Sequence, residues 1–278
     1  MGEKVTDLKV GDLVGVSPVR FSDMSCRYCK KGHHQMCEQR IYLYGDFFGG
    51  FCTHMQIDHN WAIKLPQGLD IREVPPLLCA GITVYAPLKR FNRIGGKCAV
   101  LGIGGLGHLA IQYANKLGME VTAFTTRLNN IDSLRQMGAT DAQHSVDEEY
   151  LRKNEGKYDV VCSTLYIENP VLYKLHQRLT KPGGVYMMLG APNGDTDYQI
   201  DTEYMVANEI TVAGSNVGSI GEVKDMLEFS AHYNVKSINE YFSFEDFPKA
   251  LHRAEKEAPR YRCVINVTDW AKKNGFDK

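Results

Sequence analysis

The chain contains the stretch Cys98-Ala99-Val100-Leu101-Gly102-Ile103-Gly104-Gly105-Leu106-Gly107, an apolar run that passes into a glycine-rich turn. The run predicts a buried strand, and residues 107–117 place apolar side chains at helical spacing. A strand, a glycine turn and a helix in this order are typical of a dinucleotide fold, where glycines allow a tight turn and the helix N-terminus faces the pyrophosphate. Because such glycines also occur in ordinary loops, the flanking strand and helix make the prediction specific. The cofactor-binding residues predicted here are Gly102, Gly104, Gly105, Leu106 and Gly107.

Strands and helices alternate on both sides of this turn. Apolar runs at 121–125, 158–162 and 185–190 predict further strands with helices between them, which indicates a doubly wound parallel sheet. Before residue 65, short β-like runs such as 13–16 and 51–57 alternate with turn residues. We therefore predict an α/β protein with two domains. A Rossmann domain spans 81–218, and a mainly β domain is formed by 1–80 and 219–278, the latter with helices at 222–232 and 247–256 and a strand at 261–267.

Composition excludes several functional classes. The 278 residues are 44% hydrophobic and 23% charged, with a formal net charge of -1, which gives no sign of a nucleic-acid partner. The apolar stretches are too short and too rich in glycine to cross a bilayer, and the charged first 15 residues are no signal peptide. Eight cysteines are too few for a secreted disulfide scaffold. We expect a cytoplasmic protein with neither nucleic acid nor membrane as partner.

The end of the second predicted strand bears on which nucleotide is bound. NAD-binding folds place a carboxylate there for the ribose hydroxyls, whereas this chain has Thr125-Thr126-Arg127. A guanidinium can bind a 2′-phosphate bidentately, and threonine hydroxyls can donate to it. The alternative is a polar loop with a solvated arginine. We favour NADP(H) over NAD(H), with Thr125, Thr126 and Arg127 at the 2′-phosphate.

Three closely spaced cysteines, Cys26-x2-Cys29-x7-Cys37, have the spacing of a structural zinc loop. A closed tetrahedral site needs a fourth ligand. Asp23 continues the spacing of every third residue, and His33 and His34 within the loop are alternatives, because carboxylate and imidazole both bind zinc. The competing interpretation is a metal-free loop with three reduced thiols.

Five further cysteines are scattered along the chain. Cys79 lies in the apolar segment 75–85, where the ordinary interpretation of a free cysteine is a small buried hydrophobic residue. The same interpretation holds for the others, which are Cys52, Cys98, Cys162 and Cys263.

Together these stretches resemble the zinc-dependent medium-chain alcohol dehydrogenases, and among them the cinnamyl-alcohol-dehydrogenase-like branch. The likeness extends along nearly the whole chain and rests on several motifs in the family's order. These are Val10-Gly11-Asp12-Leu13-Val14-Gly15-Val16, Cys26, Cys29 and Cys37, Leu77-Leu78-Cys79-Ala80-Gly81-Ile82-Thr83-Val84-Tyr85, the turn 102–108, Thr125-Thr126-Arg127, Gly214-Ser215-Asn216-Val217-Gly218-Ser219, and Arg260-Tyr261-Arg262-Cys263-Val264-Ile265-Asn266-Val267.

The resemblance implies reversible oxidation of an alcohol, cinnamyl, aryl or aliphatic, to an aldehyde, with hydride passing to NADP+ and a catalytic zinc acting as Lewis acid. It implies that the mainly β domain is GroES-like, and it adds Gly190, Ser215 and Asn216 to the cofactor residues. Asp23 stands where the family has the first of four structural-zinc cysteines. Cys79 corresponds to the third protein ligand of the catalytic zinc. The family's usual dimer forms through strands near 210–218, so we expect a homodimer.

One departure from the family concerns catalysis. The family's first catalytic cysteine, its Gly-His-Glu motif and the hydroxyl of its proton relay precede the segment where this chain starts, and no Gly-His-Glu occurs here. Cys79 is the only expected catalytic-zinc ligand, so we predict an incomplete GroES-like domain in which no catalytic set is intact.

Three functions follow as alternatives. The first is an NADP(H)-dependent alcohol dehydrogenase completed by a further N-terminal segment. The second is an inactive NADP(H)-binding relic or fragment. The third is a zinc-free reductase like the quinone reductases of the same superfamily, against which the zinc loop and the Cys79 segment argue.

Overall fold

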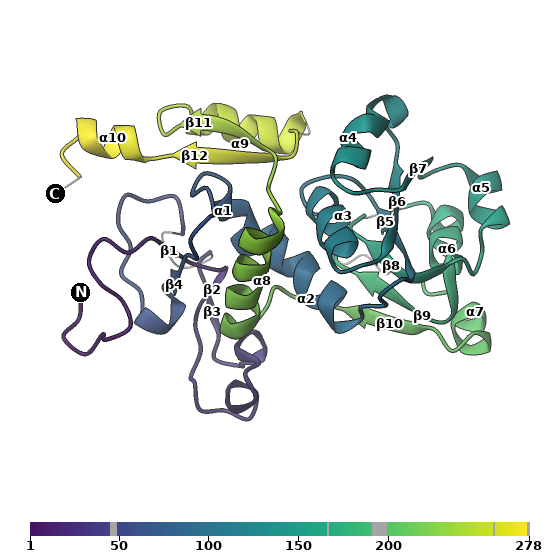
Figure 1. Ribbon diagram of the computed structural model, residues 1–278, viewed down its shortest axis with the longest axis horizontal. Coiled ribbons are helices and arrows are strands. Elements are labelled where there is room, and N and C mark those ends of the chain that lie inside the picture. The colour runs from purple at the N-terminus through teal and green to yellow at the C-terminus, as the bar shows by residue number, and fades with distance from the viewer. Residues whose placement is uncertain (45–48, 166, 191–198, 258, 277–278) are drawn as a thin grey trace. The chain divides into compact units, whose positions relative to one another are not determined.

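A computed structural model describes residues 1–44, 49–165, 167–190, 199–257 and 259–276 (Figure 1). The chain folds as two compact units. We call Thr83–Asn216 the central unit, and Met1–Ile82 together with Val217–Lys278 the terminal unit. Each of these boundaries lies two residues from the corresponding domain boundary predicted above.

The central unit is built on one parallel sheet of six strands in the order β10-β9-β8-β5-β6-β7. The chain first moves outward from β5 through β6 to β7, and then returns to add strands on the other side of β5. This arrangement is the doubly wound α/β topology that the alternation predicted. The strands are β5 (Lys97–Leu101), β6 (Glu120–Thr125), β7 (Asp141–His144), β8 (Tyr158–Ser163), β9 (Thr180–Met188) and β10 (Thr211–Gly214).

Helices connect these strands, as parallel strands require. Leu101, Phe124 and Val161 of the strands pack with Tyr173 and Leu175 of a helix in one buried cluster. Strands covered on both faces are continuous apolar runs, which explains why four consecutive residues of β5 are fully buried. The helices are α2 (Ile82–Arg90), α3 (Gly107–Lys116), η5 (Leu128–Asn130), α4 (Ile131–Gln136), α5 (Glu148–Lys153), α6 (Pro170–Arg178) and α7 (Thr202–Ala207).

The terminal unit has three sheets of two strands each among the described residues. Two are antiparallel, β1 (Val14–Gly15) with β4 (Ile63–Lys64) and β2 (Val19–Phe21) with β3 (Ile41–Tyr42). The third pairs β11 (Asn239–Ser243) with β12 (Arg262–Asn266) in parallel. Two-stranded sheets are marginal in isolation, so these pairs depend on the helices packed around them.

Short helical turns and longer helices complete the terminal unit. The longest helix, α8, begins with a capping box in which Ser219 and Glu222 bond each other's backbone N–H. The elements are η1 (Cys29–Lys31), η2 (His34–Met36), η3 (His59–Trp61), α1 (Val74–Pro76), the π-helical turn η4 (Leu77–Gly81), α8 (Ile220–Tyr233), α9 (Phe247–Lys256) and α10 (Thr268–Lys273). Within the described parts of the chain, no helix is both long and apolar enough to cross a membrane.

One predicted strand is absent. Residues 51–53 form bends, and residues 54–57 have no regular secondary structure and no strand partner among the described residues. The carbonyl of Gln56 accepts a hydrogen bond from the Arg20 guanidinium at 2.9 Å, and the ring of Phe51 packs against Phe247. The local pattern favoured a strand, but a strand also needs a ladder partner for its backbone groups.

Candidate functional site

The predicted nucleotide turn lies where β5 ends and α3 begins. Gly102 has a φ of +86°, and its N–H donates to the carbonyl of Phe124 at 3.0 Å. The hydroxyl of Thr164 donates to the carbonyl of Gly102 at 2.8 Å, which fixes the turn from β8. A Cβ on Gly102 would stand 2.6 Å from the Cγ of Leu165, so only glycine fits this position without rearrangement.

The rest of the turn is open on one side. A Cβ placed on Gly104 would meet no atom within 4 Å, so there is open space beside this residue. No side chain caps the start of α3 at Leu106. The buried imidazole of His108 lies 3.0 Å from the carbonyl of Gly104 and holds the turn from within α3. A phosphate could therefore approach the helix N-terminus from the side of Gly104.

The other predicted cofactor residues lie at the same edge of the sheet. Thr125 ends β6, and its hydroxyl accepts the backbone N–H of Arg127 at 3.1 Å. Gly190 follows β9, while Ser215 and Asn216 follow β10. Because all six strands are parallel, their carboxyl ends share one edge, where this fold binds its ligands. The predicted cofactor residues thus come from four strand ends of one sheet.

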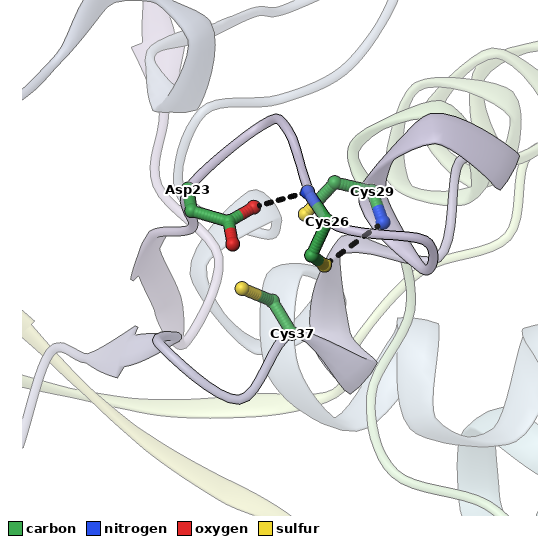
Figure 2. A group of neighbouring side chains, drawn as sticks. All are labelled: Asp23, Cys26, Cys29 and Cys37. Atoms are coloured by element: carbon green, nitrogen blue, oxygen red, sulfur yellow. Dashed lines mark hydrogen bonds between the residues drawn. The ribbon is translucent and has the colours of Figure 1, made fainter.

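A group of four possible metal ligands lies in the terminal unit. One ligand atom each from Asp23, Cys26, Cys29 and Cys37 lies within 4.8 Å of the others (Figure 2). Asp23 follows β2, Cys29 opens η1, and Cys37 follows η2. The two histidines considered as alternatives, His33 and His34, do not belong to this group.

Backbone hydrogen bonds orient the ligands. One oxygen of Asp23, Oδ1, accepts the N–H of Ser25 at 2.8 Å and of Cys26 at 2.9 Å. The N–H of Cys29 donates to the sulfur of Cys26 at 3.4 Å (Figure 2). These N–H groups lower the pKa of Asp23 to about 2 and also lower the pKa of Cys26. The loop therefore presents Asp23 as a carboxylate and favours deprotonation of Cys26.

Like Cys37, Cys29 is buried. Burial raises the pKa of its thiol to about 12, so the thiolate needs a cation beside it. Three sulfurs and one carboxylate oxygen are a ligand set that zinc accepts. The residues therefore fit a closed, structural zinc site.

Sequence reasoning missed two side chains next to this group. Ser22 is 1% exposed, and its Oγ accepts a hydrogen bond from the Cys29 thiol at 3.4 Å. Gln35, between the second and third cysteines, donates from Nε2 to Oε2 of Glu222 at 3.4 Å. The first contact is local, whereas the second joins residues 187 positions apart and has no signal in the sequence.

Cys79 lies in the π-helical turn η4, and its side chain is exposed rather than buried as expected. The helix buries Leu77, Leu78, Ala80 and Gly81 instead. Of the other isolated cysteines, Cys98 and Cys162 are buried as predicted, whereas Cys52 and Cys263 are only partly buried. Among the described residues, Cys79 belongs to no group of three or more possible metal ligands.

Comparison with known proteins identifies the class. Residues 1–67 match the alcohol dehydrogenase GroES-like domain, and residues 105–232 match the zinc-binding dehydrogenase family. The chain is 32% identical over 267 residues to an aldehyde reductase of Synechocystis, covering 96% of this chain and 78% of that protein. It is 31% identical over 277 residues to a probable cinnamyl alcohol dehydrogenase of Populus deltoides, covering 96% and 76%.

Solved structures agree with the sequence comparison. A cinnamyl alcohol dehydrogenase from Helicobacter pylori in complex with NADP(H) superposes with a TM-score of 0.86 at 27% identity, covering 96% of this chain and 78% of that one. An enzyme from Sorghum bicolor superposes with a TM-score of 0.84 at 28% identity and the same coverage. Fold and sequence thus define an oxidoreductase of the alcohol dehydrogenase class. The chain belongs to the zinc-dependent medium-chain alcohol dehydrogenase family, in its cinnamyl-alcohol-dehydrogenase-like branch.

Proposed function

We propose that this chain binds NADP(H) and serves the interconversion of a primary alcohol, cinnamyl, aryl or aliphatic, and its aldehyde. The observation behind the choice of cofactor is the end of β6, where Thr125, Thr126 and Arg127 stand in place of a carboxylate. A carboxylate would repel a 2′-phosphate, whereas a guanidinium attracts it. The Helicobacter pylori relative was solved with NADP(H), which supports the same choice.

The residues of the central unit have distinct tasks in this proposal. The turn from Gly102 to Gly107 and the start of α3 bind the pyrophosphate, and Arg127 with the threonines binds the 2′-phosphate. Gly190, Ser215 and Asn216 lie at the ends of β9 and β10 and hold the nicotinamide half. The bound cofactor supplies the hydride chemistry, while the chain orients it.

The terminal unit holds a structural zinc in this proposal. Asp23 uses Oδ2, since Oδ1 already accepts two backbone N–H groups, and Cys26, Cys29 and Cys37 complete a tetrahedral set. A catalytic zinc does not fit the described residues, because Cys79 belongs to no group of three or more possible metal ligands among them. Catalysis through that ion requires ligands other than those described.

A second candidate function is an NADP(H)-binding protein without turnover, which is favoured because no described group of three or more possible metal ligands includes Cys79. Turnover of cinnamyl, benzyl and short aliphatic alcohols by the purified chain discriminates between the two. Zinc content adds a second criterion. One zinc per chain fits the structural site alone, two fit a complete dehydrogenase, and none favours a zinc-free reductase.

The cofactor proposal is tested by titrating the chain with NADPH and NADH and following nicotinamide fluorescence. We expect the Arg127→Ala variant to weaken NADPH binding by roughly tenfold to a hundredfold and to leave NADH nearly unchanged, since hydrogen bonds to charged groups contribute about 1.5–3 kcal/mol. The matched control is Arg135→Ala, an exposed arginine of α4 in the same unit. Equal losses for both nucleotides would contradict the assignment of Arg127 to the 2′-phosphate.

We also propose a cytoplasmic homodimer. Among the described residues β10 pairs only with β9 and so forms an edge of the sheet, where a second copy can add its own edge strand. None of the eight cysteines, all of which the structure describes, forms a disulfide, which suits a reducing compartment. Sedimentation of wild-type chain and of a Val212→Pro variant tests the interface, since proline removes a strand donor.

A further inference from the structure

Gln35 connects the cysteine loop to a distant helix of the terminal unit. It lies in η2, between Cys29 and Cys37, and is only 5% exposed. Its Nε2 donates to Oε2 of Glu222, while its Oε1 is buried without a partner among the described residues. A buried amide loses its water partners, so this side chain is held by a bond that costs free energy to break.

The acceptor of this bond is the residue that caps α8. Oε2 of Glu222 also accepts the backbone N–H of Ser219 at 2.8 Å, and Oγ of Ser219 accepts the N–H of Glu222 at 3.2 Å. One carboxylate oxygen therefore joins the cysteine loop to the first turn of α8. Movement of η2 would disturb both of its bonds.

The chain just before α8 has little freedom to move. Val217 is buried with a φ of +39°, a conformation that is costly for a β-branched residue. A Cβ on Gly218 would stand 2.6 Å from Cγ1 of the buried Ile82. The conformation of residues 217–219 is therefore maintained by the residues packed against them, such as Ile82. Ser215 and Asn216, assigned above to the cofactor, immediately precede it.

We propose that metal binding to Asp23, Cys26, Cys29 and Cys37 is coupled to NADP(H) binding through Gln35, Glu222 and residues 215–219. The inference rests on the proposed function. When a cation is bound, the four ligands restrain the cysteine loop, and the bond from Gln35 to Glu222 restrains the start of α8. Without a cation the cysteine loop becomes more mobile. Residues 215–219, which lead into α8, then become more mobile as well. Cofactor binding must then order that segment, so its affinity falls.

The first test measures the dissociation constant of NADPH for the full chain with Zn2+ and after removal of Zn2+ by a chelator. We expect metal removal to weaken NADPH binding at least fivefold, the lower end of ordinary coupling. Coupling is reciprocal for one metal, so NADPH must raise the affinity for Co2+ by the factor by which Co2+ raises the affinity for NADPH, with Co2+ binding measured from thiolate-to-Co2+ absorption. An NADPH affinity that is independent of metal, or a Co2+ affinity that is independent of NADPH, would overturn the proposal.

The second test removes the connection without removing either site. We expect Gln35→Ala to bind both ligands with the coupling factor reduced towards one. The matched control is Gln39→Ala, an exposed glutamine just beyond the last cysteine, which must keep the full factor. Full coupling in Gln35→Ala would show that the metal acts by general stabilisation and would refute the route proposed here.

Failure of the proposed function can be distinguished from failure of the coupling. If Zn2+ or NADPH does not bind the wild-type chain, the proposed function and the coupling both fail. If both bind and neither affects the other, only the coupling fails. Far-UV circular dichroism of the metal-depleted chain checks that it remains folded, and loss of the folded signal counts against the route through Gln35.

Discussion

Gly107 lies directly against the carbonyl oxygen of Gly102, so closely that a Cβ on Gly107 would overlap that oxygen. The contact joins Gly102, the first residue after β5, to Gly107, the first residue of α3. It explains why glycine is required at the end of the phosphate turn as well as at its start. Gly104, between them, has open space around its Cβ position.

We predict different outcomes for two alanine substitutions in this turn. Gly107→Ala should lower the free energy of unfolding of the central unit by roughly 1–3 kcal/mol, because the backbone must move to admit the methyl group. Gly104→Ala should leave stability nearly unchanged but abolish NADPH binding, because the methyl group occupies the approach of the pyrophosphate. Urea denaturation and NADPH titration measure the two effects. A stable Gly107→Ala that binds NADPH normally would contradict the geometry.

Asp23 gives a prediction about metal affinity. Asp23→Asn keeps an oxygen for the N–H groups of Ser25 and Cys26 but loses the charge, so Zn2+ affinity should fall by about tenfold or more. Asp23→Cys should raise Zn2+ affinity by supplying a fourth thiolate. Competition with a chromophoric chelator measures both changes.

The matched control for this series is Glu38→Gln, which removes an exposed charge next to Cys37. Its Zn2+ affinity should equal that of the wild type. If Asp23→Asn and Glu38→Gln have the same small effect, the carboxylate of Asp23 serves the turn and not the metal.

His176 predicts an acid-sensitive stability of the central unit. It is fully buried in α6 with Nε2 at 2.7 Å from the carbonyl of Ser145, and burial lowers its pKa to about 4 from 6.5. Between pH 6.5 and 4, His176 is therefore protonated in the unfolded chain and neutral in the folded chain. The free energy of unfolding is therefore not reduced by His176 above pH 6.5. It falls as the pH drops from 6.5 towards 4, by roughly 3 kcal/mol in all.

Near-ultraviolet circular dichroism of the central unit's tyrosines can follow this loss in urea titrations between pH 7 and 5. The chain's two tryptophans, Trp61 and Trp270, lie in the terminal unit, so their fluorescence reports that unit separately. His176→Gln should flatten the pH dependence, whereas His252→Gln, at an exposed site, should not. An unchanged slope in His176→Gln would contradict the assignment.

Exposed apolar residues near β1 predict self-association of the chain. Val10, Leu13 and Val14 are 89%, 57% and 42% exposed, beside a sheet that has two strands in the part of the chain that the structure describes. Such edges and patches promote pairing between chains. We expect the double variant Val10→Lys/Leu13→Lys to increase the monodisperse fraction in size-exclusion chromatography. Ile94→Lys, at an exposed apolar site of the central unit, is the control, and an equal gain there would refute the local cause.

The sequence alone determined the parallel sheet of the central unit and predicted which residues at its edge bind a cofactor. The strand–turn–helix around Gly102 is recognisable because hydrophobic period and glycine position are local properties. The residues Thr125 to Arg127 follow a predicted strand for the same reason, and the three cysteines were found from their spacing. The helix at 247–256 was also predicted with its observed bounds.

Only the tertiary structure decided features that depend on contacts between distant segments. It brought Asp23 rather than His33 or His34 to the cysteines, exposed Cys79, and left 51–57 without a strand partner. It also joined Gln35 to Glu222 across 187 residues. Local periodicity specifies how a segment folds, but which side chains meet is set by how separate segments pack, and that packing is not written in any single stretch of the chain.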